Sequence, residues 1–114
     1  MSGAIEPGWL ALYPTVDVEI GTPLRVEVEG RPPLCIFHLE DGFFVTDDTC
    51  THGEASLADG FVEGDEIECP FHSGKFCVRD GRATAFPAVD PIKVYPVRVI
   101  DGQVCIAEAA PTED

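Results

Sequence analysis

Two short segments of this chain each pair one cysteine with one histidine, and these residues are the best equipped to do chemistry. The first segment reads Cys50-Thr51-His52 and the second reads Cys69-Pro70-Phe71-His72. The residues between them are numerous enough for a β-hairpin that brings the two segments together. Thiolates and imidazoles are soft to borderline metal donors, so four of them in two compact segments indicate a metal site.

The donor set distinguishes two kinds of metal site. A cluster of two irons and two sulfides, with two cysteines on one iron and two histidines on the other, requires this set. Tetrahedral zinc also accepts two cysteines and two histidines, but zinc fingers commonly group the cysteines together and the histidines together. Each segment here mixes the two types. We therefore favour the iron–sulfur cluster and keep zinc as the alternative.

Histidine ligation also changes the charge of such a cluster. Two ferric ions and two sulfides leave a positive charge that two thiolates neutralise, whereas four thiolates make the site anionic. Adding an electron to a neutral site costs less than adding it to an anionic one. Mixed ligation therefore raises the reduction potential from about −400 mV to a range of roughly −150 to +300 mV.

The elements that must position these donors are short strands. Residues 24–29 alternate apolar and charged side chains, which predicts a half-buried strand. Residues 34–39 and 43–46 flank an Asp-Gly turn, and residues 97–100 and 103–106 flank another, so each pair predicts a hairpin.

A further hairpin is predicted between the two metal-binding segments. Its strands are residues 61–63 and 66–68, joined by Gly64-Asp65. On this map Cys50 and Cys69 each follow a strand, which places both donor segments in loops at one end of a sheet. Because no apolar period of 3.6 residues occurs, we expect an all-β fold of small antiparallel sheets, with the cluster held between two loops at one end.

Length and composition indicate one domain. The chain has 114 residues, which leaves no room for a second catalytic domain. We expect a single domain over residues 9–106, with its cluster-binding part at about 46–88 and flexible ends at 1–8 and 107–114. No apolar run is long enough to cross a membrane. The N-terminal residues lack the features of a secretory signal, so we expect a soluble, cytoplasmic protein.

Charge and cysteine content restrict the partners and the compartment. Seven Lys and Arg against 21 Asp and Glu give a formal charge of −14, which disfavours binding to nucleic acid or anionic lipid and favours an acidic docking face for a basic partner. Five cysteines, an odd number, argue against a disulfide framework. Cys35, Cys77 and Cys105 lie in apolar or alternating stretches, where we expect buried packing.

At the donor segments the chain resembles the Rieske-type [2Fe-2S] ferredoxins of bacterial aromatic-ring-hydroxylating dioxygenase systems. The similarity extends over about residues 9–106, including residues 74–79 and 93–98. The resemblance implies that Cys50 and Cys69 hold one iron and that His52 and His72 hold the other. It also implies a proline-bearing third loop at Phe86-Pro87-Ala88 that covers the cluster.

Several positions differ from the high-potential Rieske proteins of respiratory complexes. Those proteins carry an extra cysteine in each cluster loop, where this chain has Ala55 and Phe71, and hydroxyl donors where this chain has Gly74 and Phe76. Ser73 lies one place too early to replace the missing serine. The resemblance therefore implies a potential at the low end of the Rieske range.

The implied function is a monomeric one-electron carrier between a flavoprotein ferredoxin reductase and a terminal Rieske oxygenase. A complete oxygenase would need a further iron held by two histidines and a carboxylate, yet only His38 remains, and its apolar strand favours packing over metal binding. We therefore expect an electron-transfer component and not an enzyme. The alternatives are a fixed Rieske subunit of another oxidoreductase and a zinc-binding interaction module. Lys75 and Arg79 are expected to pair with nearby carboxylates.

Overall fold

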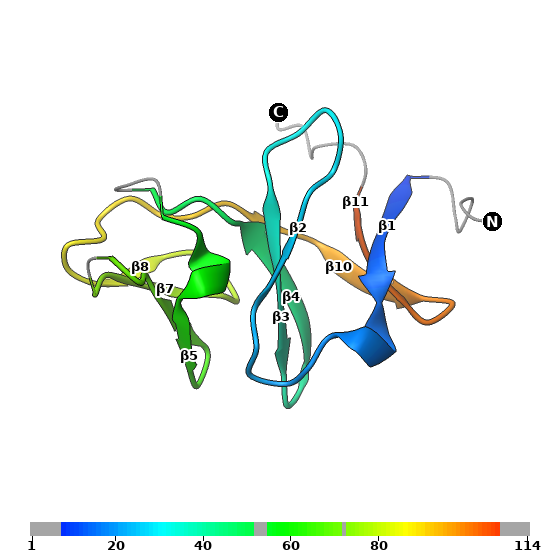
Figure 1. The fold of residues 1–114 in the computed structure, drawn as a ribbon, viewed down its shortest axis with the longest axis horizontal. Helices are drawn as coiled ribbons and strands as arrows, with labels where there is room; N and C mark the ends of the chain where they lie inside the picture. Colours follow the sequence, from blue (N-terminus) through cyan, green and yellow to red (C-terminus); the bar gives the residue numbers. More distant parts are fainter. Residues whose placement is uncertain (1–7, 52–54, 72, 108–114) are drawn as a thin grey trace.

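The computed structural model describes residues 8–51, 55–71 and 73–107. In these residues the chain forms three antiparallel sheets and two short 3-10 turns, without an α-helix (Figure 1). The elements in chain order are β1 (Trp9–Pro14), η1 (Thr15–Asp17), β2 (Leu24–Val26), β3 (Leu34–Leu39), β4 (Gly42–Asp47), η2 (Leu57–Asp59), β5 (Phe61–Glu63), β6 (Glu66–Glu68), β7 (Lys75–Cys77), β8 (Ala83–Ala85), β9 (Val94–Tyr95), β10 (Val97–Ile100) and β11 (Gln103–Ala107).

Two of the sheets, which we call the basal sheets, contain the longer strands. One has the strand order β1-β11-β10 and the other has the order β2-β3-β4-β9. The β3–β4 hairpin pairs all six residues of each strand, from Leu34 opposite Asp47 to Leu39 opposite Gly42. The all-β class and the hairpins predicted at residues 34–46 and 97–106 are confirmed.

The third sheet, which we call the distal sheet, has the order β5-β6-β7-β8 and strands of three residues each. Figure 1 shows it to one side of the β2-β3-β4 strands, with β1, β10 and β11 on the other side. Its β5–β6 hairpin is the one predicted between the two donor segments, and it turns at Gly64. The sequence analysis did not predict β7 and β8, nor β1 at residues 9–14.

The strand predicted over residues 24–29 is too long. Its ladder ends where Val26 pairs with Leu34, and the backbone turns at Val28, whose carbonyl accepts the N–H of Arg31. The residues preceding Leu34 are Pro32 and Pro33, which have no N–H to donate to a neighbouring strand. Alternation in the sequence therefore gave the orientation of the side chains correctly but not the length of the ladder.

Strand β3 separates two hydrophobic cores. Its odd-numbered residues, including Cys35 and Phe37, pack with side chains of the distal sheet in the distal core. Its even-numbered residues, Leu34 and Ile36, pack with residues of β4 and β11 in the basal core. Successive residues of a strand point to opposite faces, and both faces are covered here. The run from 34 to 39 is for this reason apolar almost throughout.

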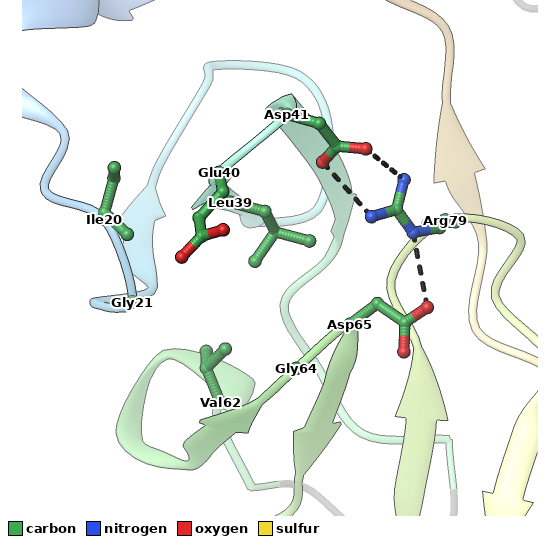
Figure 2. A pocket seen from close by; sticks show the side chains of 9 residues that line it. All are labelled: Ile20, Gly21, Leu39, Glu40, Asp41, Val62, Gly64, Asp65 and Arg79. Carbon is green, nitrogen blue, oxygen red and sulfur yellow. Dashed lines mark hydrogen bonds and ion pairs between the residues drawn. The ribbon is translucent and has the colours of Figure 1, made fainter.

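Arg79 connects the distal sheet to the β3–β4 turn. Its guanidinium binds both carboxylate oxygens of Asp41, at 3.0 and 3.1 Å, and one oxygen of Asp65, at 3.3 Å. Figure 2 shows these three side chains at the edge of a pocket that is also lined by Leu39 and Val62. The predicted pairing of Arg79 with carboxylates is confirmed, and the pair spans the two parts of the fold.

Within the described residues, no helix is long and apolar enough to span a membrane. The ends predicted to be flexible fall mainly at residues 1–7 and 108–114, which lie outside the described residues. At the C-terminal side, β11 continues to Ala107, one residue beyond the predicted domain end.

Candidate metal centre

The two cysteines of the donor segments each begin a loop that is closed by the same kind of hydrogen bond. The N–H of Cys50 donates to the carbonyl of Ala55 at 3.0 Å, and the N–H of Cys69 donates to the carbonyl of Gly74 at 2.8 Å. Both bonds span five residues. The two loops are thus built alike, each folding back directly after its cysteine.

Antiparallel pairing supports the base of each loop. Thr49 forms a β-bridge with Ser56 below the first loop, and Glu68 pairs with Lys75, at the ends of β6 and β7, below the second. Gly60 allows the first loop's returning segment to approach β6, because a Cβ at this position would lie 2.1 Å from the carbonyl oxygen of Glu68. A side chain here would push apart the segments that hold the two cysteines.

Burial brings the two thiols into one environment. Cys50 is 3% exposed and Cys69 is 1% exposed, and both belong to the distal core. Two buried thiols, each at the start of a closed loop, are suited to bind a soft metal. The residues fit one iron of a [2Fe-2S] cluster held by two cysteines.

The histidine half of the predicted ligand set, His52 and His72, lies outside the described residues. Within the part of the chain that is described, no three His, Cys, Asp or Glu side chains come close enough to hold a metal. His38 has a packing role, as predicted. Its Nδ1 lies 2.8 Å from the carbonyl oxygen of Val18, and its ring stacks on Phe43 with centroids 4.0 Å apart.

A third loop, at residues 86–92, lies against the first. The hydroxyl of Thr51 donates to the carbonyl of Asp90 at 2.9 Å. Ile92 donates its N–H to the carbonyl of Gly81, where a Cβ would lie 2.1 Å from the Ile92 oxygen. The loop contains the cis peptide bond between Phe86 and Pro87. The proline-bearing segment is therefore in place beside the first donor loop.

Large apolar side chains are exposed on the second donor loop and on the third loop. Phe71, between Cys69 and His72 in sequence, is 72% exposed. In the third loop Phe86 is 83% exposed and Val89 is 66% exposed. Sequence analysis treated Phe71 only as the position of a missing cysteine. Its exposure instead gives this end of the molecule an apolar contact surface.

The remaining cysteines and Lys75 behave as predicted. Cys35, Cys77 and Cys105 are buried. The Nζ atom of Lys75 binds Glu63 at 2.8 Å across the distal sheet. This hydrogen bond raises the pKa of Lys75 and lowers the pKa of Glu63.

Sequence analysis missed Asp48, which is only 1% exposed and lies two residues before Cys50. In a chain with 21 acidic residues, nothing local marks one carboxylate as buried. Its hydrogen-bond partners lie at positions 56 and 58. Only the return of the first loop brings those donors to it.

Comparison with known proteins gives consistent matches over most of the chain. Residues 8–96 match the Rieske [2Fe-2S] domain family. Ferredoxin CarAc of Metapseudomonas resinovorans is 43% identical over 99 residues, covering 87% of this chain and 92% of that protein. The ferredoxin component of the naphthalene 1,2-dioxygenase system of Pseudomonas aeruginosa is 44% identical over 95 residues, covering 83% of this chain and 89% of that protein.

A solved structure shows the same fold. In the complex of reduced oxygenase and oxidized ferredoxin in carbazole 1,9a-dioxygenase, the matching chain is 41% identical and superposes with a TM-score of 0.85. The match covers 95% of this chain and all (100%) of that one. Fold, donor residues and relatives thus point to the same kind of protein.

Proposed function

We propose a function that starts from one fact: this chain belongs to the Rieske [2Fe-2S] domain family. It is the ferredoxin component of a bacterial aromatic-ring dioxygenase system. It is an electron carrier and not an enzyme, as its relatives in the naphthalene and carbazole systems are named ferredoxins. The observation that carries the proposal is the pair of buried thiols, Cys50 and Cys69, in two loops of identical closure.

We assign the ligands by position in the two loops. Cys50 and Cys69 would hold one iron, and His52 and His72 the other, in keeping with the mixed ligation of Rieske clusters. The bound cluster accepts and returns one electron. The residues of the chain keep the thiols out of water through the distal core and hold each loop closed.

The partners follow from the relatives and from the charge of the chain. A terminal oxygenase is one partner, as in the carbazole complex. For the other we propose a flavoprotein reductase that supplies electrons from NAD(P)H, with this chain acting as a monomer in the cytoplasm. The formal charge of −14 would steer it toward a basic surface on each partner.

Optical spectroscopy and reconstitution test this function. The purified protein should be red-brown and should bleach on reduction, and it should pass electrons from a reductase to the oxygenase of an aromatic-ring dioxygenase. A colourless protein containing zinc would contradict the cluster. A coloured protein that copurifies in a stable larger enzyme and does not exchange between partners would indicate a fixed subunit.

Phe71, the exposed aromatic residue of the second donor loop, provides a sharper test of contact with the oxygenase. Phe71→Ala should slow electron transfer to the oxygenase, because interface aromatics carry a large share of binding energy, while leaving the reduction potential near that of the parent protein. Val16→Ala is a suitable control, since Val16 is 88% exposed in η1 of the basal part. Equal rates for the two variants would exclude Phe71 from the contact.

A further inference from the structure

Asp48 makes contacts that link the first donor loop to the rest of the fold. One carboxylate oxygen accepts the hydroxyl of Ser56 at 2.6 Å, and the other accepts the N–H of Ala58 at 3.0 Å. Its own N–H donates to the carbonyl of Pro33 at 3.0 Å, and its carbonyl accepts the N–H of Leu57 at 2.7 Å. The residue therefore joins the outgoing and returning segments of the loop.

The same carboxylate takes over a capping role in η2. Ser56 occupies the N-cap position but makes no side-chain cap, because its hydroxyl donates to Asp48. Asp48 instead accepts the Ala58 N–H at the start of this turn, which supplies the acceptor that an N-cap side chain usually provides. The position of the returning segment thus depends on a carboxylate across the loop.

The environment of Asp48 keeps its charge from being screened by water. The side chain is 1% exposed, and Nη1 of Arg25 lies 3.7 Å from one of its carboxylate oxygens. The neighbouring Cys35 thiol is also buried, and its pKa is raised by burial and then by the negative charge of Asp48. In such surroundings a charge acts over a longer range than it does at the surface.

We propose that Asp48 is a positioning residue for the metal centre, which fixes the first donor loop and holds the reduction potential down by placing a buried negative charge two residues before Cys50. The inference rests on the proposed function of the chain as the carrier of a cluster. Reduction adds one negative charge to that site. A fixed negative charge nearby makes that addition less favourable.

Asp48→Asn is the direct test, because asparagine keeps the size of the side chain and removes its charge. Its amide oxygen can still accept the Ala58 N–H while its NH₂ group donates to the Ser56 hydroxyl. We expect the one-electron reduction equilibrium to shift toward the reduced form by about tenfold, which corresponds to about 59 mV.

Asp47→Asn is the matched control. Asp47 is the adjacent residue and also carries a carboxylate, but this carboxylate accepts a hydrogen bond from the hydroxyl of Tyr95 in β9. Its substitution removes the same formal charge and should shift the potential far less. An equal shift in both variants, or no shift in Asp48→Asn, would overturn the proposal.

Ser56→Ala tests the sign of the effect and remains informative if Asp48→Asn does not fold. This change removes one donor from the carboxylate and leaves its charge less compensated, so the potential should fall. A rise would contradict the proposal.

A cluster-independent readout separates this inference from the function on which it rests. In the protein as purified, with or without a bound cluster, the amides of residues 56–58 should exchange faster in Asp48→Asn than in Asp47→Asn. A parent protein without a cluster would defeat the proposed function, while this comparison would still test the anchoring role. Equal exchange in both variants would overturn that role.

Discussion

The two faces of β3 contact cores of different chemistry. The basal core is built around aliphatic side chains such as Ile36, Val104 and Ile106, supplied by β3 and β11, which have six and five residues. The distal core contains the two donor cysteines with Phe37 and Phe76, and its sheet has strands of only three residues. One strand thus supports an ordinary hydrophobic core on one side and a metal-binding core on the other.

This difference indicates which sheets depend on metal binding for their stability. Burial of aliphatic side chains stabilises the basal sheets without any ligand. Very short strands give little independent stability, and metal binding can supply folding free energy where ligands must be held together. We therefore expect loss of the cluster to weaken the distal sheet more than the basal sheets.

Loss of a cysteine thiolate should have the largest effect on the difference in stability between the distal sheet and the basal sheets. Cys69→Ser should abolish the visible absorption of the protein, because one iron loses half of its cysteine ligands. Hydrogen exchange should then accelerate in residues 61–85 by at least an order of magnitude more than in residues 97–107. Removal of iron from the parent protein with a chelator should reproduce this pattern.

Cys105→Ser provides the control for this change. Cys105 is buried in β11 and its thiol donates to the carbonyl of Gln103 at 3.6 Å, so this variant should retain its colour. If Cys69→Ser accelerated exchange equally in both parts of the molecule, the two cores would form one cooperative unit and the contrast would be wrong.

Neighbouring residues of β3 allow the two cores to be weakened separately. Phe37 is 1% exposed and Ile36 is fully buried. Truncation to alanine should cost about 3–5 kcal/mol at Phe37 and about 2–5 kcal/mol at Ile36. Both variants should unfold at lower denaturant concentration, but only Phe37→Ala should also lose its cluster faster. Cluster loss followed by visible absorption at a temperature below unfolding would check this difference.

The local pattern of the sequence was sufficient to predict the hairpins. Asp-Gly and Gly-Asp turns between β-forming runs located β3–β4, β5–β6 and β10–β11, because turn residues and strand periodicity act over a few positions. The same pattern placed Cys50 shortly after β4 and Cys69 directly after β6. The assignment of Cys50, His52, Cys69 and His72 as ligands stays a prediction.

Long-range contacts could not be predicted from the sequence. Strand β7 forms because it pairs with β6 on the other side of the second donor loop, and nothing in residues 75–77 alone requires a strand. The Arg79–Asp41 pair joins residues 38 positions apart. No feature of the sequence distinguishes Asp48 from the many other acidic residues. In each case the partner, and not the local pattern, determines the role of the residue.

Disruption of the contact that Arg79 makes between the distal sheet and the β3–β4 turn should reduce stability less than weakening either core. Arg79→Gln removes the ion pairs with Asp41 and Asp65 and the contact of the guanidinium with the Phe44 ring, 4.9 Å from its centroid. Exposed pairs contribute little to stability and are screened by salt. We expect a slight decrease in the thermal midpoint that is larger at low salt.

Arg82→Gln is the matched control for Arg79→Gln. Arg82 pairs with Asp80 at 3.3 Å within one turn of the distal part. Its loss should leave the exchange rates of the β3–β4 turn unchanged, whereas Arg79→Gln should increase them. Equal increases in the two variants would show that Arg79 has no linking role.

The pH dependence of the contribution that the Arg79–Asp41 pair makes to stability should be the smallest effect. The hydrogen bonds from Arg79 lower the pKa of Asp41 below its ordinary value of 3.8. Because the pKa is lower in the folded state than in the unfolded chain, the contribution of the pair is present above the unfolded value and is lost as the pH falls through the folded value. The difference in thermal midpoint between the parent protein and Arg79→Gln, compared in metal-free protein, should therefore be constant near neutral pH and shrink as the pH falls below 3.8, the ordinary pKa of Asp41. A difference that persisted in acid would assign the role of Arg79 to its packing on Phe44, since that contact does not depend on the protonation of Asp41.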